Sequence, residues 1–462
     1  MNAPATDLLW APRAWLPEGW RDNVLLRIGR DGCWAEVNAD VNTPVPGAIV
    51  LDRPLLPGLV DAHSHAFQRA FAGLAERREA HGDDFWSWRD RMYAVALRIT
   101  PEQLRAVAAQ LYVELLRGGY TQVCEFHYLQ HDRDGRPYPD PLCLAWALAD
   151  AANDAGIGLT LMPVLYERAG FAEASLRSDQ RRFSFNADQV WAAATRIAAA
   201  RRPGVDAGLA VHSLRAAAPA SIRHLSQAAA AFDGPIHVHV AEQTAEVDDC
   251  LSSTGRRPIE WLAHEGVLDA RWQLVHATHA TATEIEAVAR SAAGVVLCPS
   301  TEANLGDGLA DLTAWSAAAV PLAIGSDSHV TRDWREELRW LDYGQRLALR
   351  KRNVAARPQA GQASTAGALF SAALAGGAAA AGKHRWGLQV GARADALLPD
   401  PQDPMCLGTP AAHGLDAAVF SSPSMPWRDV MVAGRWVIRD HRHTLGDSVS
   451  EAFATAMAAL WA

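Results

Sequence analysis

The strongest constraint on the fold is a set of eight short apolar runs, rich in β-forming residues, between residues 55 and 330. In chain order they are LLPGLVDAHSH, YTQVCEFHY, IGLTLMPVLY, DAGLAVHSL, PIHVHVAEQ, WQLVHATHA, GVVLCPST and VPLAIGSDSH. Alanine-rich segments with helical periodicity separate most of them. Strands that alternate with helices pair in parallel, and eight such units predict a closed (β/α)8 barrel. An open nucleotide-binding sheet is disfavoured because no G-x-G-x-x-G turn follows the first run.

The segments outside the barrel have a different pattern. Residues 1–54 contain NVLLRIGRDGCWAEV, which predicts a hairpin around Arg-Asp-Gly, and residues 386–462 contain strand and turn patterns in GARADALLPD and VMVAGRWVIRDHRH. We therefore expect both chain ends to form a small flanking β-sandwich with a C-terminal tail, beside a barrel at residues 55–385. Residues 361–382 are low in complexity, but their periodic apolar content predicts a packed helix.

Composition narrows the partners and the compartment. Of 462 residues, 49% are hydrophobic and 21% are charged, and the net charge is -9. Nucleic acids and anionic membranes require concentrated positive charge, so neither partner is expected. The six cysteines are scattered without a C-x-x-C pair, the N-terminus lacks a signal-peptide pattern, and no stretch reaches about 18 apolar residues. These features predict a cytoplasmic protein. A homodimer is expected only because dimers are common.

Polar side chains gather at the carboxyl ends of the predicted strands. Those ends open onto one face of a parallel barrel, where active sites form, so residues distant in sequence should meet there. The side chains expected to line this mouth are His63, His65, Glu125, His127, Tyr166, His212, His239, Glu242, His276 and Asp327.

The densest group of candidate metal ligands is His63-x-His65, at the end of the first strand. The period of two in a strand directs both imidazoles to one face, so both can bind one ion. Asp327 ends the eighth strand, which adjoins the first when the barrel closes. His239 lies at the mouth, whereas His237 lies roughly 6.5 Å deeper and is expected to be a hydrogen-bonded core residue. Three histidines and one aspartate suit a single divalent ion, most simply zinc with a water at its open position. No lysine precedes the end of the eighth strand, so a binuclear centre bridged by a modified lysine is not expected.

Several motifs resemble those of one enzyme family. PGLVDAHSH, HVHVAEQ, LVHATH and IGSDSH are similar to motifs of the amidohydrolase superfamily, in its single-metal deaminase branch. AFQRAFAGLAE, STEANLGDG, and DSHV followed by EELRWLDYGQRL, resemble more closely the formimidoylglutamate deiminases of histidine degradation. The resemblance runs from residue 50 to residue 445, approximately, and one departure is Val211, where proline would be expected before His212.

The resemblance implies a hydrolase that deiminates N-formimino-L-glutamate to N-formyl-L-glutamate and ammonia. It also implies the zinc ligands His63, His65, His239 and Asp327 and the catalytic residues Glu242 and His276.

The chemistry of a formimino group leads to the same roles. Its hydrolysis needs a hydroxide at neutral pH, and zinc lowers the pKa of its water from about 15.7 to near 7. Asp327 is placed to accept the proton of that water. Glu242, three residues beyond His239, can protonate the imine and later help ammonia to leave. His276 can orient the hydroxide or stabilise the tetrahedral intermediate.

A substrate with two carboxylates requires cationic side chains in the pocket. Arginine binds carboxylates bidentately, and the candidates are Arg215, just after the fourth strand, and Arg89, in the long segment after the first. The family resemblance adds Gln68, Tyr128 and His212 as contacts to a carboxylate or to the formimino group.

Three other functions stay open. A related single-metal aminohydrolase could act on another amidine or on a heterocycle such as a purine or a pterin. For a heterocycle, the pocket would carry aromatic and amide side chains in place of paired arginines. Cleavage of the other C–N bond of the same substrate would give glutamate and formamide. A barrel kept as a structural or regulatory protein would lose at least one of His239, Glu242 and Asp327, and all three are present.

Overall fold

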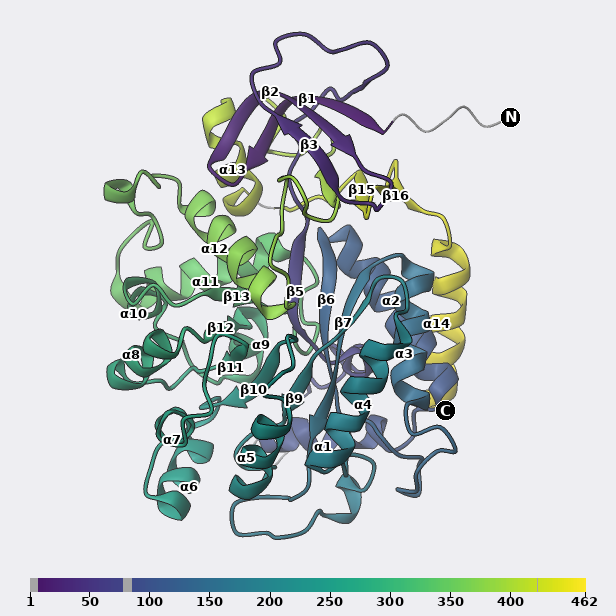
Figure 1. The fold of residues 1–462 in the computed structure, drawn as a ribbon, viewed down its shortest axis with the longest axis vertical. Coiled ribbons are helices and arrows are strands. Elements are labelled where there is room, and N and C mark those ends of the chain that lie inside the picture. The colour runs from purple at the N-terminus through teal and green to yellow at the C-terminus, as the bar shows by residue number, and fades with distance from the viewer. Residues whose placement is uncertain (1–6, 78–84, 422) are drawn as a thin grey trace.

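A ring of eight parallel strands forms the centre of the computed structural model, which describes residues 7–77, 85–421 and 423–462 (Figure 1). The strands are β5 (Leu59–Ser64), β6 (Tyr120–His127), β7 (Gly158–Leu165), β9 (Leu209–Val211), β10 (Ile236–Val240), β11 (Trp272–His276), β12 (Gly294–Leu297) and β13 (Leu322–Ile324). They pair in this chain order, and β8 (Val205–Ala207) adds to β7. A bridge between Ser64 and Asp327 joins the chain after β13 to β5 and closes the ring. The predicted (β/α)8 barrel is confirmed.

Helices connect the strands and cover the outside of the ring. They are α1 (Phe85–Ala96), α2 (Pro101–Arg117), α3 (Cys143–Ala155), α4 (Ala187–Ala200), α5 (Pro219–Ala228), α6 (Thr244–Thr254), α7 (Pro258–His264), α8 (Ala282–Ser291), α9 (Pro299–Leu305), α10 (Leu312–Ala317), α11 (Trp334–Leu349) and α12 (Thr365–Ala380). The predicted packed helix is α12, which lies against β13 and β5. Its Gly376 permits this close approach, because an added Cβ would collide with the Leu322 carbonyl.

Two small sheets lie together at one end of the barrel, at the top of Figure 1. The first contains β1 (Leu8–Leu16), β2 (Gly19–Ile28), β3 (Trp34–Asn38) and β4 (Ile49–Val50), and the second contains β14 (Ala396–Leu398), β15 (Asp429–Val432), β16 (Arg435–Arg439) and β17 (Arg442–His443). Trp34 of the first sheet and Met431 of the second belong to one buried cluster. The predicted flanking sandwich from both chain ends is confirmed, as is the hairpin, which β2 and β3 form.

The division of the chain at residues 54 and 386 stays a prediction. Two helices beyond residue 386, α13 (Gly414–Phe420) and α14 (Gly446–Trp461), pack on barrel helices: α13 on α11 and α12, and α14 along α2. Residues 1–6 of the predicted first segment lie outside the described residues. None of the helices in the described ranges is both long enough and apolar enough to cross a membrane.

Candidate metal centre and active site

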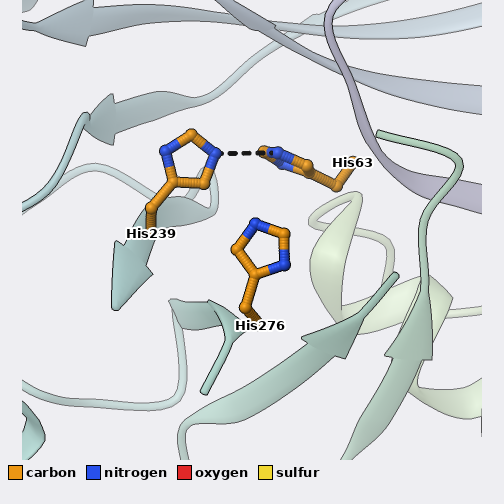
Figure 2. A group of neighbouring side chains, drawn as sticks. All are labelled: His63, His239 and His276. Carbon is orange, nitrogen blue, oxygen red and sulfur yellow. Dashed lines mark hydrogen bonds between the residues drawn. The ribbon is translucent and has the colours of Figure 1, made fainter. Parts of the chain in front are cut away.

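Four side chains from three strand ends converge on one point inside the barrel mouth. His63 and His65 follow one another on one face of β5, and their Nε2 atoms lie 3.1 Å apart. Nε2 of His239, on β10, lies 2.9 Å from Nε2 of His63. Figure 2 marks this contact with a dashed line. Asp327 Oδ1 lies 3.5 Å from His63 Nε2 and 3.4 Å from His65 Nε2. These four residues are the predicted ligand set.

The four converging groups fit a bound cation. Burial lowers the pKa of His65 to about 3 and keeps the pKa values of His63 and His239 well below their ordinary value, so the imidazoles are neutral. His63 Nε2 has two imidazole nitrogens as neighbours, and a single proton can serve only one of them. His65 Nδ1 donates to the Phe126 carbonyl at 3.0 Å, which directs its Nε2 towards the centre. Three neutral imidazoles and a carboxylate form a donor set that suits Zn²⁺.

The backbone turns sharply where these strands end. Four residues without a glycine's freedom adopt left-handed conformations there: Ala241 (φ 51°), His276 (φ 67°), Ala277 (φ 47°) and Asp327 (φ 47°). Such residues cost about 1–3 kcal/mol each and persist where the surrounding structure fixes them, as at active sites. The Asp327 N–H donates to the His63 carbonyl at 2.9 Å, which ties this turn to the adjacent strand β5.

Glu242 and His276 border the space beside the four candidate metal ligands described above, which form the ligand cluster. His276 Nε2 lies 3.7 Å from Glu242 Oε1 and 3.8 Å from Asp327 Oδ2. Burial raises the pKa of Glu242, although the neighbouring His276 acts in the opposite direction. Burial disfavours a charged His276, but Glu242, Glu302 and Asp327 outweigh it and raise the pKa of His276 to about 10. A carboxyl group with increased proton affinity and a positively charged N–H donor therefore face the same space.

A cavity adjoins these groups. It is lined by His65, Gln68, Trp88, Arg89, Met92, Tyr93, Tyr128, Tyr166, His212, Arg215, His239, Glu242, His276, Leu305 and Asp327. Every predicted site residue is thus at the cavity except His63, which is fully buried behind it.

Arginine and hydrogen-bonding side chains share this cavity. Burial lowers the pKa of Arg89, and the positive charge of Arg215 adds to this effect, so the two guanidinium groups lie within electrostatic reach of each other. Gln68 Nε2 donates to Tyr128 Oη at 3.1 Å. His212 Nδ1 lies 3.2 Å from the hydroxyl of the next residue in the chain. The cavity therefore has two neighbouring guanidinium groups together with neutral polar groups, an arrangement that suits an anionic ligand.

Two residues predicted at the mouth do not line the cavity. Side chains alternate along a strand, and Phe126 of β6 packs its ring on His239 inside the barrel. Its neighbours Glu125 and His127 therefore face the other side of the sheet. Glu125 accepts hydrogen bonds there from Ser64 Oγ at 2.8 Å and from Tyr112 Oη of α2 at 3.2 Å. Placement at a strand end alone was too weak a criterion for these two residues.

His237 and three unpredicted carboxyl groups complete the surroundings. His237 Nε2 bonds the Ala380 carbonyl at 2.9 Å, which confirms its prediction as a buried core residue. Glu302, Asp307 and Glu246 are buried close to the catalytic candidates. Glu302 and Asp307 belong to the STEANLGDG motif, whose resemblance to the deiminases assigns no role to either residue, whereas Glu246, at the start of α6, lies in no such motif.

Comparisons with known proteins agree with this geometry. A family model described as the amidohydrolase family matches residues 55–437. A formimidoylglutamate deiminase of Pseudomonas aeruginosa is 48% identical over 453 residues, which cover 98% of this chain and 99% of that protein. The crystal structure of an amidohydrolase from Brucella melitensis has a TM-score of 0.92 at 40% identity, over 98% of this chain and 100% of that one. An adenosine deaminase from Xanthomonas campestris with bound zinc shares the fold, with a TM-score of 0.79 at 22% identity over 98% of each chain. The chain belongs to the amidohydrolase family.

Proposed function

We propose that this protein is a metal-dependent hydrolase that converts N-formimino-L-glutamate and water to N-formyl-L-glutamate and ammonia. The observation that carries this proposal is a single cavity in which Glu242 and His276 border the ligand cluster and Arg89 and Arg215 supply positive charge. The 48% identity to the formimidoylglutamate deiminase of P. aeruginosa, over nearly the full length of both chains, supports it.

We propose zinc as the ion, held by His63, His65, His239 and Asp327. When bound, it would lower the pKa of a water and so provide the nucleophile at neutral pH. The neutral state of the three imidazoles supports this assignment, because a metal ligand must offer a lone pair.

The proton transfers are assigned to Asp327 and Glu242. Asp327 points Oδ1 towards the ligand histidines and Oδ2 towards His276, so one carboxylate can both bind and accept a proton from the attacking water. Glu242, with its raised pKa, donates a proton to the imine nitrogen as the new C–O bond forms. The C–N bond to that nitrogen then breaks, and both protons of the water end on the ammonia that leaves. His276 stabilises negative charge on the attacking oxygen.

The substrate carboxylates are assigned to the arginines. Arg215 and Arg89 would each bind one carboxylate, because the planar guanidinium presents two parallel donors to it. Gln68, Tyr128 and His212 line the same cavity and would contact the carboxylates or the formimino group.

We further propose that the enzyme acts in the cytoplasm, in histidine degradation. All six cysteines are free, which suits a reducing compartment. A homodimer stays a prediction.

An ammonia-release assay tests the proposed reaction. The zinc-loaded protein is incubated with N-formimino-L-glutamate, with N-formimino-L-aspartate and with a panel of purines, and the products are identified by mass spectrometry. We expect N-formyl-L-glutamate and ammonia in equal amounts from N-formimino-L-glutamate. Release of glutamate and formamide, or turnover of a purine alone, would overturn the proposal, as would full activity after complete removal of the metal.

A further inference from the structure

His276 has carboxyl groups at both ring nitrogens. Its Nε2 faces the cavity, 3.7 Å from Glu242 Oε1 and 3.8 Å from Asp327 Oδ2. Its Nδ1 points away from the cavity and lies 3.3 Å from Glu302 Oε1. The residue is only 1% exposed, so little of its ring is open to bulk solvent.

Glu302 is held rigidly in its own surroundings. It lies in the first turn of α9, and its Oε1 accepts the Cys298 N–H at 2.9 Å. The Glu302 N–H returns a hydrogen bond to the Cys298 carbonyl, also at 2.9 Å. With its side chain only 5% exposed, Glu302 presents a fixed acceptor to His276 Nδ1.

Other contacts of His276 fix the plane of its ring but leave two orientations equivalent. The ring stacks on that of His239, with centroids 5.5 Å apart and planes inclined by 22°. The backbone of His276 is held at the end of β11 with φ 67°. A half-turn of the ring about its bond to Cβ would preserve the stacking, but it would place carbon in place of nitrogen at Glu302 and at Glu242.

We infer that Glu302 is a positioning residue for His276: it accepts the Nδ1–H and thereby holds Nε2 towards Glu242 and the reacting atoms. The inference rests on the proposed function, in which His276 stabilises charge on the attacking oxygen. It adds a residue that touches neither the substrate nor the metal ligands of the proposed centre. Outer partners of this kind fix both the tautomer and the orientation of an imidazole.

Two substitutions at Glu302 separate positioning from simple packing. Glu302→Met fills a similar volume but removes the acceptor, whereas Glu302→Gln retains an oxygen that can accept from both His276 and Cys298. Glu337→Met is the matched control, because Glu337 is a buried glutamate that bonds to α9, accepting from Ser300 N at 3.0 Å and Ser300 Oγ at 2.6 Å.

We expect Glu302→Met to lower kcat by about 10- to 100-fold, the range typical for outer partners of active-site histidines. Its KM should stay within about threefold of the wild-type value, because the arginines are untouched. Each chain should still bind one metal ion. Glu302→Gln should recover most of the lost kcat. Glu337→Met should lower the thermal unfolding temperature, with kcat within about threefold of wild type.

Several results would overturn the inference. They are an unchanged kcat in Glu302→Met, an equal loss of kcat in Glu337→Met, and failure of Glu302→Gln to restore activity. Loss of metal from Glu302→Met would also overturn the inference. His276, Cys298 and Glu302 have potential ligand atoms within 4.8 Å of one another, so such a loss would make Glu302 a metal ligand and not a positioning residue.

An activity-free measurement keeps this test independent of the proposed substrate. Long-range ¹H–¹⁵N spectra of histidine-labelled, metal-loaded protein report which imidazole nitrogens carry protons, and the His276 signal is assigned by its loss in His276→Gln. We expect a protonated Nδ1 in wild type and in Glu302→Gln, with a changed pattern in Glu302→Met. Identical spectra in all three would contradict the inference, whereas absence of deiminase activity in the wild type would count only against the proposed function.

Discussion

His239 and Glu242 leave the end of the same strand, but their side chains have different surroundings. His239 Nε2 lies 2.9 Å from a second imidazole nitrogen of the ligand cluster, whereas Glu242 Oε1 lies 3.7 Å from His276. We therefore expect Glu242→Gln to retain one metal ion per chain and to lose at least about 100-fold in kcat, the usual contribution of a general acid. His239→Ala should lose both metal and activity. Metal analysis alongside ammonia release checks this division, and equal metal loss in both variants would contradict it.

Arg215 is partly buried at the cavity. Burial lowers the pKa of its guanidinium group, but the nearby Tyr166, Tyr93 and Glu246 outweigh this effect and raise the pKa. Removal of a charged hydrogen-bonding partner costs about 1.5–3 kcal/mol, so Arg215→Met should raise KM for N-formimino-L-glutamate by about 10- to 100-fold.

Arg223 provides the control for this prediction. It follows the same barrel strand on α5 but pairs with Glu265 at 2.7 Å on the surface, away from the cavity. Arg223→Met should leave KM unchanged. A KM for Arg215→Met equal to that of wild type would remove this arginine from the substrate site.

At the scale of residues, the sequence predicts what depends on spacing along one strand. The period of two places His63 with His65, and the rise along the strand separates the deep His237 from His239. Strand periodicity gives no information about groups that are distant in sequence and come together only in the folded structure. The carboxyl groups of Glu302 and Glu246 reach the site from helices that follow the strands, and no periodicity of a helix identifies the side chain that turns towards a neighbouring strand.

At the scale of elements, β5, β6 and α2 are joined by a buried carboxyl group. Glu125 accepts hydrogen bonds from Ser64 Oγ, Tyr112 Oη and, at 2.7 Å, the N–H of Ala66, so it fixes the segment that carries the His63-x-His65 pair. Burial raises the pKa of Glu125 to about 8 even though these hydrogen bonds act in the opposite direction.

This raised pKa predicts a specific pH dependence of stability. Between pH 4.5 and 8, approximately, Glu125 is protonated when folded and ionised when unfolded, so the folded state binds more protons. The free energy of unfolding of the metal-free wild type should therefore fall as pH rises through this window, by up to about 1.4 kcal/mol per pH unit from this group. Glu125→Gln cannot ionise, so its free energy of unfolding should lack this contribution.

Urea unfolding at several pH values measures the effect. The difference in unfolding free energy between Glu125→Gln and wild type should grow in favour of the variant from pH 5 to pH 8, approximately. Glu286→Gln, which changes an exposed glutamate of α8, should remain parallel to wild type. Parallel curves for Glu125→Gln as well would show that Glu125 ionises alike in both states.

Secondary-structure elements were predicted more completely than their contacts. All eight barrel strands fall within the expected apolar runs, although β9 and β13 retain only three residues each because the chain turns early into the site. The position of α14 along α2 had no sequence signal, since an amphipathic face shows that a helix packs but does not name its partner.

At the scale of the whole molecule, closure of the barrel brings together the residues of the proposed metal centre. Asp61 of β5 accepts hydrogen bonds from Ser326 N at 2.8 Å and Ser326 Oγ at 2.6 Å, across 265 residues of sequence. These bonds hold the turn that carries Asp327 against the strand that carries His63. The site therefore exists only when the ring is complete, and metal binding should be coupled to global folding.

Removal of the metal should lower the stability of the entire protein. In the metal-free state three neutral imidazoles and the Asp327 carboxylate face one another in a buried space, whereas the unfolded chain cannot assemble the same four ligands. A ligand present at 1,000 times its Kd stabilises the folded state by about 4 kcal/mol. We therefore expect chelated protein to unfold at lower temperature and lower urea concentration, and zinc to restore both stability and activity. Glu242→Gln should gain the same stability from zinc as wild type, and His239→Ala should gain little. Identical unfolding curves for wild-type protein with and without zinc would show that the four groups do not bind a metal that is coupled to folding.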